Sequence, residues 1–201
     1  MKYALVLFTL LLSFSTYADD SAYEAVREGV YWDQLYADDY GTLYCGAAFA
    51  AGDDPPTIEH VYPASWIAEA NGCPGRDDCP MDSYRSASSD LHNLWPAVGR
   101  YNMSRGNQAF GEIPGNTPRF SGDTCDYERT SGRGAIVEPR DSVKGDIARS
   151  ILYMIHWYDL PDHDMLPMLI RWHIQDAPDD NERWRNNRIE ELQGNRNPFV
   201  N

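Results

Sequence analysis

Positive charge is scarce in this chain of 201 residues. Lys and Arg together number 17 against 31 Asp and Glu, which gives a formal net charge of −14 at pH 7. A broad surface that coats a polyanion is built from many cationic side chains, so this composition argues against such a surface. It does not exclude a small cleft in which a few arginines and a divalent cation supply positive charge locally.

Long apolar runs are also lacking. The apolar run at residues 4–12 is far shorter than the roughly 20 residues that a membrane-spanning helix needs. Because Lys2 precedes it and small residues ending at Ala18 follow it, the run is typical of a secretory signal peptide. We therefore expect a signal peptide at residues 1–18, cleaved after Ala18, and a single domain at residues 19–201. The mature protein is expected in the periplasm or outside the cell, without a membrane partner; a retained membrane anchor is the alternative.

Cysteine is rare, with four residues in the whole chain, at positions 45, 73, 79 and 125. Export to an oxidising compartment favours disulfides for these residues. Four cysteines allow three pairings. Cys73 and Cys79 bracket a short loop that one bridge would close, which leaves Cys45 to pair with Cys125. A zinc site is the alternative, but the chain has no second close pair of Cys or Cys and His.

The pattern of apolar residues predicts a mixed α+β domain. Residues 64–89 and 110–140 are rich in Gly, Pro and polar residues, and we expect loops there, with at most one short strand in the second range. Helical spacing is found in four ranges, namely residues 20–40, 143–158, 165–174 and 181–192. Extended segments are expected at residues 42–49, 57–62 and 91–98, and a further helix is expected after Gly99.

Glu59 and His60 stand together near the end of a predicted strand that Pro63 stops. Neighbouring side chains of a regular strand point to opposite faces, so both can face one site only if the strand bends there. Facing one site, Glu59 would offer a hard oxygen to Mg²⁺, and neutral His60 would accept a proton from water. Taken alone, such a pair is more often found on an exposed strand.

Asn102 and Arg105 are three residues apart, so on the predicted helix they share one face. An amide oxygen beside one carboxylate makes a sparse Mg²⁺ site that leaves coordination positions for substrate. The alternative for Asn102 is a helix cap. An acid, a histidine, an amide and an arginine can together bind one metal ion, activate water and hold a phosphate, which predicts a phosphodiester hydrolase.

Three ordered motifs carry a resemblance to a known family: IEHVYPAS, DLHNLWPAVGRYNMSRGN and QGNRNPFV. They resemble the endonuclease I family of periplasmic and secreted bacterial nucleases, and the similarity runs from about Tyr23 to the last residue. The resemblance implies a ββα-metal (His-Me finger) core, in which two strands and a helix surround one divalent ion. Additional helices and long disulfide-bridged loops are expected around that core.

The resemblance also implies roles for single residues. Glu59 and Asn102 would be the metal ligands, and His60 the general base. Arg76, in the loop between Cys73 and Cys79, would steady the scissile phosphate, a contact that Arg105 could share or take over. One departure from the family is Met103-Ser104 after Asn102, where many members have Gly-Asp.

Asn93 precedes Asn102 by nine residues, which is close to the spacing of a loop-bracing Asn in related ββα sites. We therefore expect Asn93 to brace the connection after the strand and to orient His60. Asp90 and His92 are expected to make structural hydrogen bonds.

The resemblance thus implies a non-specific endonuclease that cleaves DNA and RNA. We expect it to act as a monomer and to leave 5′-phosphate ends. Its cofactor would be Mg²⁺, with Mn²⁺ or Ca²⁺ as substitutes. One alternative is a zinc hydrolase that uses His60, His92 and Glu59, although the chain has no HExxH motif. The other alternative is a non-catalytic module that binds nucleic acid or a cell-surface polymer, and the strongly negative charge argues against it.

Overall fold

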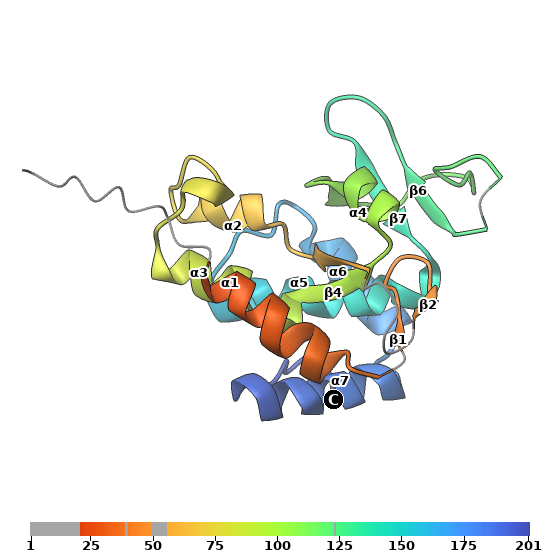
Figure 1. The fold of residues 1–201 in the computed structure, drawn as a ribbon. Helices are drawn as coiled ribbons and strands as arrows, with labels where there is room; N and C mark the ends of the chain where they lie inside the picture. The colour runs from red at the N-terminus through yellow and green to blue at the C-terminus, as the bar shows by residue number, and fades with distance from the viewer. Residues whose placement is uncertain (1–20, 39, 50–55, 123) are drawn as a thin grey trace, which may run out of the picture.

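The computed structural model describes residues 21–38, 40–49, 56–122 and 124–201, so the predicted signal peptide lies outside the described residues. It confirms the α+β class, because helices pack around several short strands (Figure 1). None of the described helices is both long and apolar enough to cross a membrane.

The N-terminal helix begins as α1 (Ser21–Ala25) and continues as a π-helix, η1 (Val26–Leu35). It ends earlier than the predicted limit at residue 40. The chain leaves the helix at Tyr36, whose buried hydroxyl accepts a hydrogen bond from Arg185 Nε at 2.8 Å. This bond ties the end of the first helix to the last one, and the two helices lie side by side (Figure 1).

The C-terminal half follows the predicted helical pattern. The helices are η4 (Asp141–Val143), α5 (Lys144–Tyr158), α6 (Leu166–Gln175) and α7 (Asp180–Gln193). Helix α5 lies at the centre of the core, with Ile147 and Ile151 fully buried, and α6 packs closely against it. The approach is so close that a Cβ on Gly145 would lie 2.1 Å from the Asp176 carbonyl oxygen.

Two antiparallel strands and a helix surround the region of the predicted site. Strand β3 (Thr57–His60) pairs with β4 (Leu94–Ala97), with His60 opposite Leu94, and β4 leads into α4 (Gly99–Arg105). Strand β3 is shorter than predicted, because Val61 and Tyr62 form a bend before Pro63. A 3₁₀ turn, η3 (Leu91–Asn93), replaces the start of the second predicted strand.

The prediction of a loop at residues 64–89 is wrong. The range contains α2 (Ala64–Ala70), the 3₁₀ turn η2 (Arg76–Asp78) and α3 (Asp82–Ser88). Their composition is polar, but Ile67, Ala68, Tyr84 and Ala87 turn one side of each α-helix into the core. Tertiary packing therefore overrides the weak local preference.

Short strands were also missed elsewhere. Residues 110–140, where at most one strand was predicted, contribute to a three-stranded sheet that begins at residue 109. Its order is β5-β7-β6, with β5 parallel and β6 antiparallel to β7. Its strands are β5 (Ala109–Phe110), β6 (Tyr127–Arg129) and β7 (Ile136–Pro139). The predicted extended segment at residues 42–49 is instead a small hairpin of β1 (Tyr40–Gly41) and β2 (Ala48–Phe49).

Two disulfides join distant and near parts of the chain, in the pairing expected from loop length. Cys45 bonds Cys125 across 80 residues, and Cys73 bonds Cys79 across 6 residues. The long bridge attaches the β1–β2 hairpin to the segment before β6, while the short bridge closes the loop that carries η2.

The two bridges should contribute unequally to stability. In the chain-entropy model the bridge across 80 residues stabilises by about 4.5 kcal/mol, and the bridge across 6 residues by about 2 kcal/mol. We therefore expect the Cys45→Ala/Cys125→Ala protein to lose about twice as much unfolding free energy as the Cys73→Ala/Cys79→Ala protein in urea titrations. Equal losses would contradict the model for this fold.

Candidate active site

A cavity of about 420 Å³ brings together most of the predicted site residues. Glu59 and His60 enter it from the end of β3, Asn102 and Arg105 from α4, and Arg76 from the loop with η2. Both neighbouring side chains therefore reach one cavity at the end of the strand, next to the bend at Val61 and Tyr62. Asn93 lies outside the residues that line the cavity. Tyr23, Met103 and Asn107 line it as well.

Glu59 is almost fully buried, with 1% of its surface exposed. Its Oε1 accepts hydrogen bonds from the Tyr44 hydroxyl at 2.8 Å and from Arg105 Nη1 at 2.9 Å. Its Oε2 carries no hydrogen bond to the described part of the chain. Burial raises the pKa of the Glu59 carboxyl to about 7, against the lowering effect of Arg105 and Tyr44. A cation at Oε2 would favour the ionised form.

The His60 ring has a defined tautomer. Its Nε2 lies 2.9 Å from the Ser88 carbonyl oxygen. A carbonyl can only accept, so Nε2 carries the proton and Nδ1 is left with a free lone pair. Burial lowers the pKa of His60 to about 4, and the charges of Arg76 and Arg105 act in the same direction. The imidazole is therefore neutral at neutral pH and able to accept a proton.

Asn102 presents its amide in one orientation. Both N–H groups of Nδ2 are engaged by β3, through Thr57 Oγ1 at 3.0 Å and the Ile58 carbonyl oxygen at 2.9 Å. Oδ1 is left as an acceptor without a partner among the described residues. Glu59 Oε2 and Asn102 Oδ1 are thus two hard oxygens that remain available in one cavity, and this donor set fits a divalent ion such as Mg²⁺.

Asn93 brackets the bend that follows His60. Its side chain accepts from the Tyr62 N–H at 2.6 Å and donates to the Tyr62 carbonyl oxygen at 2.9 Å. Its own carbonyl oxygen accepts from the Val61 N–H at 3.0 Å. Asn93 is fully buried and contacts backbone only in these bonds, so its effect on the site is through the position of the chain around His60.

The two arginines of the cavity differ in what they can reach. Arg76 is 66% exposed and makes an ion pair with Asp77 at 3.1 Å. Arg105 is 1% exposed, and besides Glu59 it donates to the His60 and Val61 carbonyl oxygens at 2.8 and 2.7 Å. Its guanidinium also lies over the Phe110 ring at 4.7 Å. The exposed guanidinium of Arg76 is therefore accessible to an anion in solvent, whereas the guanidinium of Arg105 is buried and bonded to groups of the protein itself.

The family of the chain is clear from comparison with known proteins. A family model described as Endonuclease I matches residues 11–201. The chain belongs to the endonuclease I family. This membership confirms the expected resemblance and the prediction of an endonuclease.

Three similar relatives show how far the likeness extends. "Extracellular deoxyribonuclease" of Aeromonas hydrophila is 30% identical over 98% of this chain and 96% of that protein. "Endonuclease-1" of Buchnera aphidicola subsp. Baizongia pistaciae is 31% identical over 71% of this chain. "Extracellular ribonuclease" of Bacillus amyloliquefaciens is 35% identical over 56% of this chain. The aligned part spans only 60% of the Buchnera protein and 43% of the Bacillus protein.

Four contributions to the site of this endonuclease I family member were not predicted from sequence. Tyr44 bonds Glu59, and Thr57 bonds Asn102. The Tyr23 ring lies against the His60 ring, with the two ring centroids 5.1 Å apart. Ser88 contributes only its main-chain oxygen. None had a sequence signal of its own, because a tyrosine, a strand threonine and a carbonyl oxygen are found throughout any fold.

The C-terminal motif supports the segment that carries Asn93. Gln193 accepts from the Leu91 N–H at 2.9 Å and donates to Asp90 Oδ1 at 2.9 Å. The other carboxylate oxygen of Asp90 accepts from the hydroxyls of Tyr153 and Tyr158, each at 2.7 Å. Asp90 therefore has the structural role expected of it.

No group of three His, Cys, Asp or Glu side chains that could hold a metal ion occurs among the described residues. His92 in particular is buried, and its Nε2 donates to the Asn195 carbonyl oxygen at 3.3 Å. It does not line the cavity of Glu59 and His60. The geometry thus gives no support to a zinc site built from His60, His92 and Glu59.

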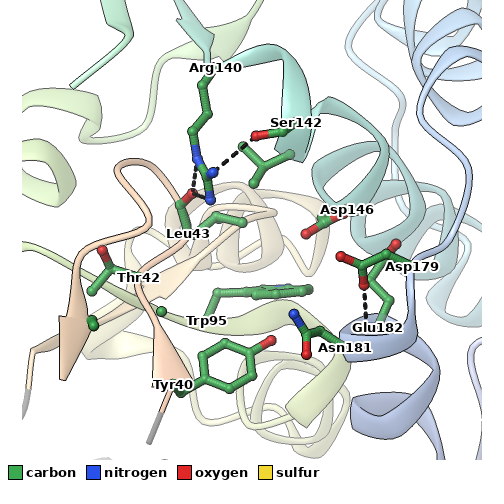
Figure 2. A pocket seen from close by; sticks show the side chains of 13 residues that line it. Tyr40, Thr42, Leu43, Trp95, Arg140, Ser142, Asp146, Asp179, Asn181 and Glu182 are labelled. Carbon is green, nitrogen blue, oxygen red and sulfur yellow. Dashed lines mark hydrogen bonds between the residues drawn. The ribbon is translucent and has the colours of Figure 1, made fainter. Parts of the chain in front are cut away.

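A larger cavity, of about 490 Å³, lies between the β1–β2 hairpin, α5 and α7 (Figure 2). None of the predicted site residues lines it. Figure 2 shows that Arg140, at its edge, bonds the Leu43 carbonyl oxygen and Ser142, while Asp179 caps α7 through the Glu182 N–H. These polar groups serve local structure, so we place the active site in the smaller cavity.

His92 should make the stability of the fold depend on pH. Burial lowers its pKa to about 4, below the value of about 6.5 expected in the unfolded chain. Between these values the unfolded state binds more protons, so stability falls as the pH falls from about 6.5 to about 4. The shift corresponds to about 3 kcal/mol.

We expect His92→Gln, which can still donate to Asn195, to lose that part of the dependence. Urea titrations of both proteins at pH 7, 5.5 and 4 would measure it. Parallel curves of unfolding free energy against pH would contradict a neutral buried His92.

Proposed function

We propose that this protein hydrolyses phosphodiester bonds of DNA and of RNA, with His60 as general base and Mg²⁺ held by Glu59 and Asn102. The observation that carries the proposal is one cavity in which a neutral histidine lies beside an exposed arginine and two hard oxygens. Among the described residues, these two oxygens and the histidine Nδ1 have no hydrogen-bond partner. Mn²⁺ or Ca²⁺ would substitute at such an oxygen site. The arrangement of β3, β4 and α4 around the cavity supports a ββα-metal core.

The substrate class rests on the site and on the relatives together. Relatives carry the names deoxyribonuclease and ribonuclease, which supports both nucleic acids as substrates. The proposed contacts reach only phosphate, so they read no base edges and sequence specificity should be low.

The reaction begins with transfer of a proton from water to His60 Nδ1. The water oxygen attacks phosphorus in line while the bond from phosphorus to O3′ breaks. The leaving oxygen takes a proton from solvent, so the products carry a 5′-phosphate and a 3′-hydroxyl. A bound divalent cation supplies Lewis-acid stabilisation of the negative charge that grows on the phosphoryl group.

The other residues position these partners. The Ser88 carbonyl oxygen holds the proton on Nε2, so that Nδ1 is the basic atom. Asn93 fixes the bend beyond His60 through its two bonds to Tyr62. Arg76 contacts the scissile phosphate through its exposed guanidinium.

Secretion of this protein would be consistent with a nuclease that acts outside the cytoplasm. We propose that residues 1–18 are a signal peptide cleaved after Ala18, and that residues 19–201 act as one monomeric domain in the periplasm or outside the cell. Two disulfides and relatives with the word extracellular in their names support this location.

The His60→Ala protein tests the general base. Loss of a general base lowers turnover by about 10²- to 10⁴-fold, and binding of metal and DNA should be nearly unchanged. Nicking of supercoiled plasmid with Mg²⁺, and its absence with EDTA, would provide the assay. His156→Ala, an exposed histidine of α5, is the matched control and should nick like the wild type. Loss of DNA binding together with activity in His60→Ala would refute the base assignment.

Removal of the Arg76 guanidinium should weaken the contact with the scissile phosphate in the transition state. We expect Arg76→Ala to lower kcat/KM by about 10²-fold, as for other single donors to a charged transition state. The control is Arg183→Ala, a half-exposed arginine of α7. Initial rates on a fluorescent duplex would measure both variants, and equal rates for the two would assign the phosphate contact elsewhere.

A further inference from the structure

We propose that Tyr44, Arg105 and Thr57 are positioning residues that fix which oxygen Glu59 and Asn102 each present to a shared cation. The inference rests on the proposed function, because it concerns the same two ligands. It also gives Arg105 a role that differs from contact with substrate.

On the Glu59 side, two donors converge on one oxygen. The Tyr44 hydroxyl and Arg105 Nη1 bond Oε1 at 2.8 and 2.9 Å. A carboxylate without such donors can rotate and present either oxygen, but here rotation would break two bonds, one of them to a charged group. Oε2 is therefore the oxygen that stays available in the cavity.

The two donors are themselves held firmly. Arg105 also bonds the carbonyl oxygens of His60 and Val61, so the base and the ligand share one support. Tyr44 is fully buried, precedes the bridged Cys45, and packs edge-on against Tyr127 with ring centroids 5.2 Å apart. Neither donor can therefore move to keep its hydrogen bond if the Glu59 carboxylate rotates.

On the Asn102 side, the amide nitrogen is bound twice. Thr57 Oγ1 accepts one N–H, and the Thr57 hydroxyl donates a hydrogen bond to the Ala97 carbonyl oxygen at 2.8 Å. The Ile58 carbonyl oxygen accepts the other N–H. With both N–H groups directed at β3, the amide oxygen has to point away from the strand.

Partners of this kind orient metal ligands in many proteins, and their loss typically costs 10- to 100-fold in metal affinity or activity. A purely structural role for the same hydrogen bonds would change stability and leave metal affinity as it was. Metal affinity therefore separates the two roles.

The test uses two near-isosteric variants of the mature chain, Tyr44→Phe and Thr57→Val. Mn²⁺ binding is measured by titration calorimetry, and thermal unfolding by circular dichroism. We expect each variant to bind Mn²⁺ about tenfold more weakly than the wild type. Excess Mg²⁺ should restore most nicking activity to both.

Two matched control variants each delete one hydroxyl group that does not contact Glu59 or Asn102. Tyr127→Phe deletes a buried hydroxyl that bonds the Tyr101 carbonyl oxygen, and Thr130→Val deletes an exposed hydroxyl that accepts from Ile136. Both should bind Mn²⁺ like the wild type. Wild-type affinity in Tyr44→Phe and Thr57→Val, or the same loss in the controls, would overturn the inference.

Two further outcomes are distinguishable. If Tyr44→Phe unfolds, Thr57→Val decides the question, because Thr57 is exposed and valine suits a strand. If the wild type binds no Mn²⁺, or Glu59→Gln binds it equally well, the cation site of the proposed function fails, and this inference fails with it.

Discussion

The buried ion pair between Arg105 and Glu59 is the interaction on which the site depends. Both side chains are at most 2% exposed, so each has lost its hydration, a cost that attraction between the two charges repays only with further hydrogen bonds. Those bonds come from Tyr44 and from the carbonyl oxygens of His60 and Val61. Because they join α4 to the end of β3, the pair also fixes the distance between the two halves of the site.

The same removal from water favours the neutral form of both the acid and the base, which helps the base and weakens the metal ligand. For His60 it favours the neutral ring, which is the form that accepts a proton. For Glu59 it also favours the neutral form, which is the poorer metal ligand. Arg105 and Tyr44 offset part of that effect. A cation at the free oxygen would overcome the remainder. Burial would thus account both for the neutral state of His60 and for the role of the proposed cation at Glu59.

The chemistry of Glu59, His60 and Asn102, together with the motifs that resemble the endonuclease I family, predicted that these residues share one site. Helices α5 to α7 followed from apolar periodicity. Sequence reasoning failed for α2 and α3, since each buries only a few residues of a polar segment and their partners are distant in the chain. The inward orientation of the Arg105 side chain was also not predicted from the sequence. Helical spacing places Arg105 near Asn102, but whether its guanidinium turns inward depends on Glu59, Phe110 and two carbonyl oxygens.

The inward direction of Arg105 changes how an acidic protein can meet a polyanion. Of the two cationic side chains that line the cavity, Arg105 points inward and is paired with Glu59, and Arg76 is paired with Asp77. The cavity therefore carries little net positive charge of its own, within a chain of net charge −14. A divalent cation there would be the largest local charge. In the proposed mechanism such a cation would attract the phosphate as well as assist its cleavage, so cation and nucleic acid would favour each other's binding.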